Sequence, residues 1–492
     1  MVIMKDQEFK KDSQRVVVIG AGPAGLTAAL ELQKRSPRHV PVVVESGDLV
    51  GGIARTESYK GFRFDIGGHR FFTKVGEVEQ MWHEIMGDDF IVVPRKSRIY
   101  YRSRFYDYPL KIFNALQNIG VYESGRIILS YAKWRMKPSM IEESFEQWVI
   151  NRFGGRLYMH FFRSYTEKVW GISPREIRAD WAAQRIKNLS LWKAVINAIT
   201  GANSTTSLIE KFHYPRLGPG MMWEKVRDRI KAQGGEVRMR SRATRLLWEG
   251  RRVHGVEVTE RSADGADHRY IEAADHVLNT MALTDLIAAF DPPPPEPVRA
   301  AAARLRYRDF LIVTLILDHP DPFPDNWVYI HSSEVKVGRI QNFRAWSAEM
   351  MPNSRQASIG MEYFCHEGDG LWAMSDADLI ELGAAELEQL GLAPKASVVD
   401  GSVIRQVKAY PVYDGEYGEA LDVIAGWLGQ FENFQTIGRN GLHRYNNQDH
   451  SMLTGMLAAR NILGERHDVW TVNVERSYHE EFELKRKEQR AK

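Results

Sequence analysis

The sequence predicts an α/β fold that begins with a nucleotide-binding strand–turn–helix unit. Residues 16–19 are a short apolar run typical of a buried strand. Three glycines follow in G-x-G-x-x-G spacing, Gly20, Gly22 and Gly25. An apolar helix pattern at residues 26–32, a second apolar run at 42–44 and the acidic Glu45 complete the unit. Together these features predict a turn that holds a dinucleotide pyrophosphate.

Each part of this unit has a mechanical reason. Gly20 permits the tight turn, Gly22 lets the backbone approach the pyrophosphate, and Gly25 lets helix and strand pack closely. The helix N-terminus offers free N–H groups and partial positive charge to phosphates. Glu45 ends the second strand and could accept hydrogen bonds from ribose hydroxyls.

The composition excludes several classes of protein. The chain has 492 residues with 66 Lys or Arg against 63 Asp or Glu, so we expect no nucleic-acid partner. Its single cysteine excludes an internal disulfide and a multi-cysteine metal site, and we expect no metal. No apolar run is long enough to span a membrane, and the first residues lack a signal-peptide pattern. We therefore expect a cytoplasmic protein whose N-terminus is a frayed lead-in.

The rest of the chain is expected to form regions that interleave along the sequence. Residues 1–95, 207–290 and 431–475 are assigned to three parts of the nucleotide-binding domain. A helical domain is expected at 110–200, and an antiparallel substrate domain at 96–109 and 300–430. Residues 476–492 are a charged tail, either a frayed helix or disordered.

Local patterns place individual elements. A capping box starts at Ser144, Pro174 fits a helix start, and Ser375 fits the N-cap of an acidic helix. The aromatic stripe at 157–170 is typical of core packing. Helices are expected at 77–90, 222–233, 375–390 and 452–462. Strands are expected at 236–247, 253–258, 276–280, 310–317, 327–331, 336–343 and 357–364, and a Gly/Pro-rich loop at 212–220.

Residues 91–108 mix apolar, aromatic and basic side chains. This pattern predicts strands joined by turns. The basic residues could line an anionic site, and a solvated strand face is an equally good interpretation.

A second motif follows the first. Gly51-Gly52-Ile53-Ala54-Arg55-Thr56 leads into Phe64-Asp65-Ile66-Gly67-Gly68-His69. This resembles the GG-x-x-R-[ST] and D-x-G-G-H signature of the amine-oxidase-like flavoprotein superfamily. The resemblance implies FAD, and a Rossmann-like FAD-binding domain with an inserted helical bundle and an antiparallel β-sheet domain. The positions expected at FAD are Gly20, Gly22, Ala24, Gly25, Glu45, Ser46, Gly52, Ile53, Ala54, Arg55, Gly68, His69, Ala243, Asn447, Gln448 and Ser451.

A third stretch narrows the resemblance. Gly438-Arg439-Asn440-Gly441, then His443-Arg444-Tyr445 and Asn447-Gln448-Asp449-His450-Ser451, is similar to the eukaryotic-type branch of the UDP-galactopyranose mutases. Patchier similarity extends over roughly residues 15–465. In that family N5 of reduced FAD attacks the anomeric carbon of a UDP-hexopyranose, UDP leaves, and the sugar recloses as a furanose without net oxidation. NAD(P)H or another reductant would supply the electrons.

The resemblance also assigns site residues. Arg185, Arg339 and Arg439 match the family's diphosphate-side arginines, and Tyr329, Tyr410 and Tyr445 match its diphosphate-binding tyrosines. Asn447 matches an Asn near flavin and sugar, and His69 the His beside the isoalloxazine. We therefore expect His69, Arg339 and Arg439 to be catalytic. Ile209 and Thr166 stand where the family carries Asn, so the sugar and the base are left open.

Three functions compete at this point. The first is an FAD-dependent mutase acting on a nucleotide-sugar. The second is an oxidative flavoenzyme of the amine oxidase or desaturase type, which shares the N-terminal signature without needing the Arg and Tyr set. The third, a non-catalytic flavoprotein, is disfavoured by the number of matched substrate-side residues. The physiological reductant and the oligomeric state are left open.

Overall fold

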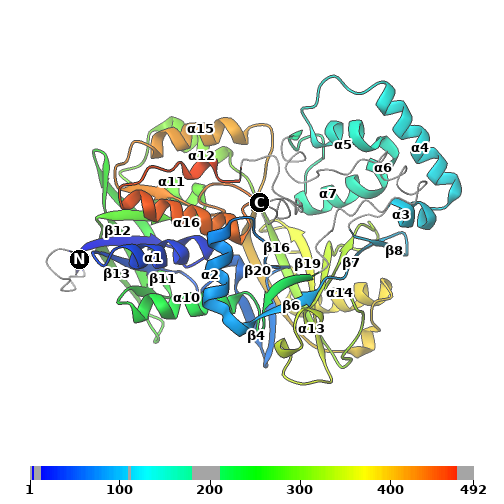
Figure 1. The fold of residues 1–492 in the computed structure, drawn as a ribbon, viewed down its shortest axis with the longest axis horizontal. Coiled ribbons are helices and arrows are strands. Elements are labelled where there is room, and N and C mark those ends of the chain that lie inside the picture. The colour runs from blue at the N-terminus through cyan, green and yellow to red at the C-terminus, as the bar shows by residue number, and fades with distance from the viewer. Residues whose placement is uncertain (1–2, 5–12, 109–111, 180–210, 474–492) are drawn as a thin grey trace, which may run out of the picture.

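The computed structural model describes residues 3–4, 13–108, 112–179 and 211–473. Figure 1 shows a region around α1 and α16, which we call the nucleotide-binding region after the sequence prediction. A large antiparallel sheet lies beside it, and a helical region lies at the outer edge around α4. The mixed α/β fold predicted from the sequence, with a parallel sheet and a separate antiparallel sheet, is confirmed.

The nucleotide-binding region is built on a five-stranded parallel sheet in the order β10-β3-β2-β14-β21. The central strand β2, Gln14–Ile19, lies between β3, His39–Val44, and β14, His276–Asn279. Val16, Val17 and Val18 are fully buried because both faces of β2 are covered. This explains the continuous apolar run and confirms the two predicted strands. The edge strands are β10, Glu236–Arg238, and β21, Phe434–Thr436.

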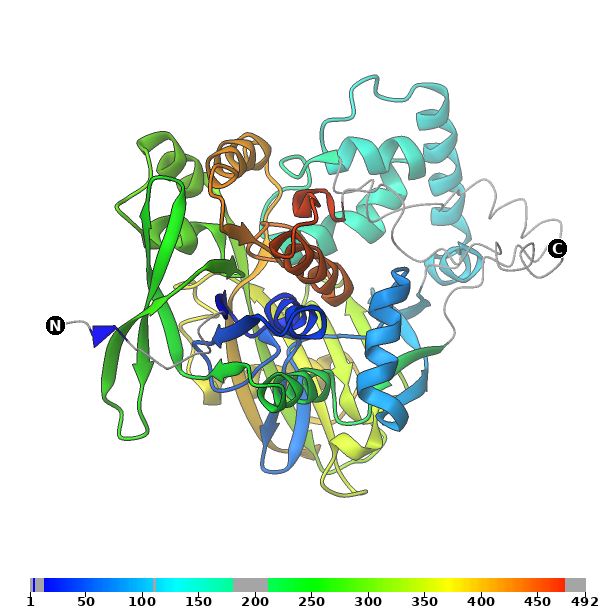
Figure 2. The ribbon, with the colours of Figure 1, turned by 60° about the vertical axis from the view of Figure 1, so that its left-hand side comes forward.

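Helices α1, Pro23–Arg35, and α16, Gln448–Ile462, form the main helix pair of this region. Figure 2 shows them side by side, in blue and red. Gly455 of α16 touches the α1 backbone: a Cβ there would collide with the Ala24 carbonyl oxygen and lie 3.1 Å from the Ala28 nitrogen. One turn further on, Arg460 reaches Glu31. Because residue numbers increase in the same direction along both helices from one contact to the next, the helices are parallel. Their N-termini therefore lie at the same end of the helix pair. The predicted start of α16 is four residues too late.

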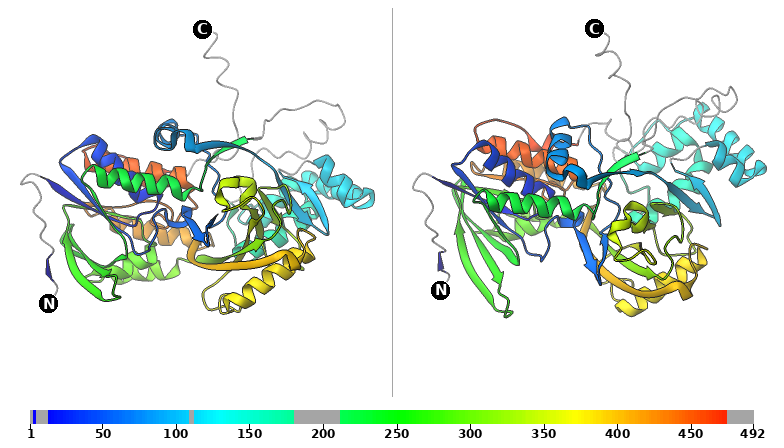
Figure 3. Two further views of the ribbon diagram at one scale, coloured as in Figure 1. Left: turned by 90° about the horizontal axis from the view of Figure 1, so that it is seen from below. Right: turned by 60° about the horizontal axis from the view of Figure 1, so that its bottom comes forward.

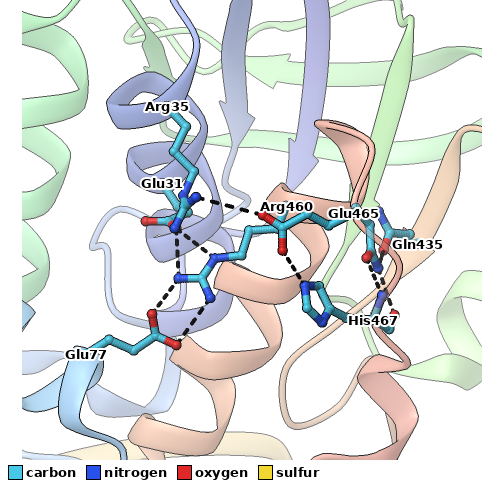
Figure 4. A network of polar contacts seen from close by, with 8 residues as sticks. Glu31, Arg35, Glu77, Gln435, Arg460, Glu465 and His467 are labelled. Carbon is cyan, nitrogen blue, oxygen red and sulfur yellow. Dashed lines mark hydrogen bonds and ion pairs between the residues drawn. The ribbon is translucent and has the colours of Figure 1, made fainter.

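A polar network fixes these helices to a third, α2, Gly76–Met86 (Figure 4). Arg460 Nη2 lies 3.0 Å from Glu31 Oε1 and 2.5 Å from Glu77 Oε2 on α2. Arg35 donates to the same Glu31 oxygen at 2.5 Å. Since part of the network is exposed, we expect a modest contribution to stability and a clear one to helix register.

A second sheet completes the nucleotide-binding region. Its order is β1-β13-β12-β11-β15. In that order, the strands are Ile3–Met4, Asp267–Ala273, Arg252–Arg261, Ser241–Glu249 and Phe290–Asp291. The region also contains four helices: α10 (Gly220–Ala232), α11 (Leu283–Ala289), α12 (Glu296–Arg304) and α15 (Tyr417–Leu428). Ile3 and Met4 pair with β13, so these two residues belong to a sheet, contrary to the frayed lead-in expected.

The antiparallel region is a seven-stranded sheet in the order β20-β16-β19-β18-β17-β7-β8. The strands are Val398–Pro411, Tyr307–Leu317, Ala357–Cys365, Arg339–Asn342, Trp327–Ile330, Ser97–Tyr101 and Arg104–Asp107. All pairings are antiparallel except β17 with β7. Sequence reasoning missed β20, because its polar and charged residues interrupt any apolar alternation. Figure 3 shows α14, Asp376–Gln389, beside β20, and Ser375 caps α14 as predicted.

The helical region contains α3, Ile112–Ile119, α4, Val121–Met136, α5, Phe145–Phe153, α6, Gly155–Tyr158, a π-helical turn, Met159–Arg163, and α7, Ser164–Trp170. The capping box at Ser144 is confirmed: Gln147 N donates to Ser144 Oγ at 3.3 Å, and Ser144 N donates to Gln147 Oε1 at 3.0 Å.

Two local predictions are wrong. Pro174 lies in a turn closed by Glu176 N donating to Ser173 O, and it starts no helix. The first half of the expected 212–220 loop is strand β9, Lys211–Pro215, which pairs with β6, Phe90–Pro94. The pairing with β6 stabilises this strand despite its flanking prolines, and a single-sequence pattern does not carry that information.

We expect Gly455→Ala to destabilise the protein, by about 1–3 kcal/mol, because the new Cβ collides with the α1 backbone. Gly426→Ala is the matched control. Gly426 also lies in a helix, α15, where a Cβ meets nothing within 4 Å, so we expect a gain of roughly 0.5–1 kcal/mol from helix propensity. Chemical unfolding of both variants measures the difference. Equal effects would contradict the close approach of α1 and α16.

Candidate active site

The two glycine motifs form one backbone surface. Gly51 N donates to Ala21 O at 2.8 Å, and a Cβ on Gly52 would lie 3.5 Å from the Gly22 Cα. Gly51 and Gly52 both have positive φ, at 104° and 57°, which favours glycine. The short 3₁₀ turn Gly52–Ala54 contains Ile53 and Ala54 and continues into Arg55. The turn after β2 and the turn before β4, Thr56–Tyr59, therefore meet.

Gly22 and Gly25 differ in what surrounds them. A Cβ on Gly25 would collide with the Gly20 carbonyl oxygen, so Gly25 is required for helix–strand packing. A Cβ on Gly22 would meet nothing nearer than 3.9 Å, so no protein atom fills that space. Gly22 is also the N-cap of α1, and no side chain caps it. The first N–H groups of α1 therefore face a position that the protein leaves open.

The N-terminus of α16 faces the same end. Asn447 is its N-cap, and its backbone N–H lies 3.3 Å from His450 Nδ1. Gln448 Oε1 accepts a hydrogen bond from Trp223 Nε1 at 3.1 Å. Ser451 is buried in the first turn. Two parallel helices thus direct the positive ends of their dipoles to one end of the parallel sheet.

Glu45 is held at the end of β3. Its two carboxylate oxygens accept hydrogen bonds from Ala21 N and Gly47 N, both at 2.8 Å, and Ser46 Oγ lies 3.3 Å from Oε1. Ser241 N donates to the Glu45 carbonyl at 2.7 Å, which places the start of β11 and Ala243 beside this corner.

The D-x-G-G-H stretch follows the hairpin of β4, Thr56–Tyr59, and β5, Phe62–Asp65. Asp65 is buried and accepts hydrogen bonds from Thr56 Oγ1 at 2.9 Å and from the Tyr214 hydroxyl. Burial raises the pKa of Asp65 to about 7. The turn after it runs tightly against β18: a Cβ on Gly68 would lie 2.9 Å from Gln341 Nε2.

His69 lies near the charged residues of the site. Its Nδ1 is 3.2 Å from the Gly67 carbonyl oxygen. Because a carbonyl can only accept, Nδ1 carries the hydrogen and Nε2 is left as an acceptor. Burial, with the charges of Arg339 and Arg439, lowers the pKa of His69 to about 3. The ring is therefore neutral near pH 7 and cannot act as an acid there.

Arg339 is one half of a buried ion pair. It lies directly opposite Glu362 in the β18–β19 register, with Nε and Nη2 donating to the two carboxylate oxygens at 2.9 and 2.5 Å. Gln341 Nε2 also donates to Glu362 at 2.9 Å. Glu362 is fully buried, whereas 19% of the Arg339 side chain stays accessible. The carboxylate holds the pKa of Arg339 well above its usual value despite burial.

Arg439 is held differently. Nε donates to Ala409 O at 2.9 Å and Nη1 to Asn446 O at 3.1 Å. Its guanidinium carbon lies 4.2 Å from the Tyr445 ring centre and 4.9 Å from that of Tyr410. Nη2 is buried and has no hydrogen-bond partner among the described residues. Arg439 therefore has an unused donor inside the protein.

Aromatic rings surround the two arginines. Tyr410 and Tyr445 stack at 5.5 Å between ring centres, and Trp170 contacts both, at 6.2 and 6.1 Å. Tyr329 meets Tyr165 edge-on at 5.8 Å. Burial raises the pKa of Tyr410. Residues from the helical, antiparallel and nucleotide-binding regions thus meet at one place.

The structure brings His69, Arg339, Arg439, Tyr410 and Tyr445 together, as the charges acting on His69 and Tyr410 show. Arg55 adds to the positive potential at His69 and donates to Gly52 O and Gln406 Oε1, both at 3.0 Å. Arg185 and Ile209 lie outside the described residues. The roles of these side chains stay predictions.

Sequence reasoning missed three residues of the site. Tyr165 faces Arg339, Tyr329 and Tyr410, whose charges and rings act on its hydroxyl. The sequence clue for Tyr165 was its position in the aromatic stripe at 157–170, which we interpreted as core packing. Glu362 is the one acidic residue of strand β19, and an acid within a mostly apolar strand was the clue that the sequence offered.

The third missed residue is Lys168. Its amine lies within 2.7–3.3 Å of four backbone carbonyl oxygens, those of Ile330, Ser332, Val335 and Val337. These carbonyls belong to the last residue of β17, which carries Tyr329, and to its connection to β18, which carries Arg339. Lys168 therefore fixes the helical region to the strands that carry two site residues.

The sequence profile of the flavin-containing amine oxidoreductases matches residues 23–418. The chain belongs to this family. It is therefore a flavin-dependent enzyme, and the family implies FAD. A curated relative, an uncharacterized protein in the nifH2 3′ region of Methanothermococcus thermolithotrophicus, is 44% identical over 55 residues. That match covers 11% of this chain, which spans about half, 51%, of the relative's length.

Solved structures share the fold over nearly the whole chain. A reduced UDP-galactopyranose mutase superposes with a TM-score of 0.79 at 20% identity, covering 94% of this chain and 97% of that one. A putative protoporphyrinogen oxidase from Exiguobacterium sp. 255-15 gives 0.69 at 15% identity, covering 92% and 98%. A putrescine oxidase gives 0.59 at 17% identity, covering 92% and 99%. At these identities the likeness establishes the fold alone.

The residues present fit the cofactor that the family implies. The open position above Gly22, the two helix N-termini and the fixed Glu45 carboxylate suit a diphosphate and a ribose. Among the described residues, no helix is long and apolar enough to cross a membrane, and no group of three His, Cys, Asp or Glu side chains could hold a metal ion.

We expect Gly22→Ala to lose FAD while keeping the fold, because its Cβ enters a space that no protein atom fills. Gly25→Ala is the contrast, since its Cβ collides with the Gly20 carbonyl and should lower stability directly. Absorbance at the flavin band, compared with thermal unfolding of the FAD-free proteins, separates the two effects. Normal FAD content in Gly22→Ala would contradict the assignment of this turn.

Asp65 predicts a pH dependence of stability. Its folded pKa of about 7 exceeds the unfolded value, so the folded state binds the extra proton and loses stability as pH rises through about 4–7. The stability advantage of wild type over Asp65→Asn should shrink by about 3 kcal/mol between about pH 5 and 8. Parallel unfolding curves for the two proteins across this range would show that Asp65 does not titrate there.

Proposed function

We propose that the chain is an FAD-dependent sugar-nucleotide mutase that interconverts the pyranose and furanose forms of a nucleoside-diphosphate hexose, as UDP-galactopyranose mutases do. One observation carries the proposal. The guanidinium groups of Arg339 and Arg439 and the Tyr410–Tyr445 pair gather beside the Gly67–His69 turn, next to which the mutase resemblance leads us to expect the flavin ring. Such a set of donors suits a diphosphate.

Electrostatics favours an anion over an amine in this site. Arg439 forms no ion pair within the described part of the chain, and its positive charge lies on the face of the Tyr410–Tyr445 pair. An ammonium substrate entering here would be repelled by Arg439. A leaving diphosphate would be stabilised by it, because charge-assisted hydrogen bonds strengthen as charge develops.

The acid–base properties of the site also support a reaction without proton transfer from a side chain. His69 is neutral with a pKa of about 3, and Glu362 is already engaged by Arg339 and Gln341. When bound and reduced, FAD would supply a nucleophilic N5 for the anomeric carbon. His69 would then orient groups beside the ring through its Nε2 acceptor.

The remaining residues have positioning or binding roles in this proposal. Glu362 fixes the plane of the Arg339 guanidinium, and the Ala409 and Asn446 carbonyls fix that of Arg439. Both arginines would hold the diphosphate while the sugar reorganises, which keeps the leaving group close for its return. The substrate-binding set would be Arg185, Tyr329, Tyr410, Tyr445 and Asn447. NAD(P)H or another reductant would provide the electrons.

An FAD-dependent oxidoreductase of the amine oxidase or desaturase type is the second candidate. The family match and the putrescine oxidase likeness favour it. It needs no diphosphate site, so nucleotide binding separates the two candidates.

We expect Arg439→Ala to weaken the binding of UDP or another nucleoside diphosphate to the reduced protein by about 1.5–3 kcal/mol, the usual range for hydrogen bonds to a charged group. Arg439→Lys should be little better. A single ammonium cannot bond to the carbonyl oxygens of Ala409 and Asn446 and also present a further donor in the same plane, as the guanidinium does. Flavin fluorescence during titration measures the affinity, and FAD content should be unchanged.

Arg339 requires a different variant, because Arg339→Ala alone would leave Glu362 buried and unpaired. Arg339→Gln with Glu362→Gln removes both charges together. We expect it to bind the diphosphate more weakly while FAD remains bound. Arg229→Ala, at an exposed pair with Glu84, is the matched control. Equal nucleotide affinity in wild type and all variants would end the mutase proposal.

A further inference from the structure

Helix α4 presents one continuous face outward. Tyr122, Arg126, Leu129, Lys133 and Met136 recur at intervals of three and four residues, so they lie on one side of the helix. We call these five residues the α4 outer face. The opposite side carries Ile127, which is buried in the helical region.

Exposed apolar side chains concentrate on and around α4, and three of them, Tyr122, Leu129 and Met136, belong to the α4 outer face. Among the described residues, seven of the thirteen exposed large apolar side chains lie between positions 121 and 141. Leu129 is 72% exposed, Met136 77%, and Met140, just beyond the helix, 95%. Scattered single residues of this kind are normal, but a contiguous group indicates an interaction surface.

The same face is basic. Arg126 and Lys133 lie on it, and Lys137 follows directly after the last turn. The one acid of α4, Glu123, is turned inward, where Arg156 donates to it at 2.6 Å and His160 lies 2.9 Å away; Arg126 reaches it at 3.7 Å. Lys133 and Lys137 have no ion pair within the described ranges. The face therefore combines apolar side chains with uncompensated positive charge.

The combination of exposed apolar side chains and positive charge indicates which kind of partner would bind this face. A second copy of the chain would bring two basic faces together, and a nucleic acid would leave the apolar side chains in water. An anionic lipid surface satisfies both properties, because acyl chains accept Leu129 and Met136 while lysine and arginine reach the headgroups. The position of α4 at the outer edge of the molecule, in Figures 1 and 3, lets a flat surface approach it.

We propose that the α4 outer face binds an anionic phospholipid surface, with the helix axis parallel to the membrane plane. The helix would lie in the interface over about 24 Å of its length, without spanning the bilayer. This inference concerns the attachment of the enzyme and does not depend on the reaction that it catalyses.

Flotation of the FAD-bound protein with vesicles tests the proposal. Phosphatidylcholine vesicles with about 30% phosphatidylglycerol should bind wild type, and pure phosphatidylcholine vesicles should bind it at least tenfold more weakly. Binding should fall as NaCl is raised to about 0.5 M, because screening weakens the headgroup contacts.

Two variants separate the two properties of the face. Leu129→Glu with Met136→Glu, and Lys133→Glu with Lys137→Glu, should each lower the partition coefficient at least tenfold. Val399→Glu is the control, since Val399 is another exposed apolar residue, on β20 and away from α4. It should bind like wild type. Flavin absorbance and thermal unfolding should be unchanged in all three, since every substituted side chain is exposed.

Three results would overturn the proposal. The first is no binding of wild type to anionic vesicles at low salt. The second is equal binding of wild type and both face variants. The third is a change from dimer to monomer in light scattering caused by Leu129→Glu with Met136→Glu, since that would assign the face to a second copy of the chain.

Discussion

The close, parallel packing of α1 against α16 is the constraint on which the rest of the structure depends. Gly455 allows the two backbones to touch, and Arg460 fixes their register through Glu31 and Glu77. Because the helices are parallel, the N-termini that follow the first and the last motifs of the chain meet at one end of the sheet. Residues more than 400 positions apart in the sequence thereby come together at one surface, and two helix N-termini at one place suit an anion.

The site beside that surface is built from compensated and uncompensated charge. The Arg339–Glu362 pair is costly to bury, and it is retained with every carboxylate oxygen engaged. Arg439 has only carbonyl and ring contacts, so its charge remains available. Both charges act on the neutral His69. A site of this kind suits a negative group.

Much of this arrangement could be predicted from the sequence, because its motifs are local. The glycine turns, Glu45, the capping box at Ser144 and the N-cap Ser375 each depend on a few neighbouring residues. Elements fixed by distant partners could not be found in this way. Strand β20 is polar in sequence and is stabilised by pairing with β16, and β9 is stabilised by β6. The same holds for Glu362 and Lys168, whose partners come from other strands or regions.

The central claim is that the enzyme rearranges a nucleotide-sugar without oxidising it. The most direct measurement is to incubate the dithionite-reduced protein with a panel of nucleoside-diphosphate hexopyranoses and to separate the products by chromatography. The account predicts a new isomer of one of them, of unchanged mass, formed by the reduced protein and absent with the oxidised one. No isomer from any sugar nucleotide, together with reduction of the oxidised flavin by an amine, would contradict it and identify an oxidase.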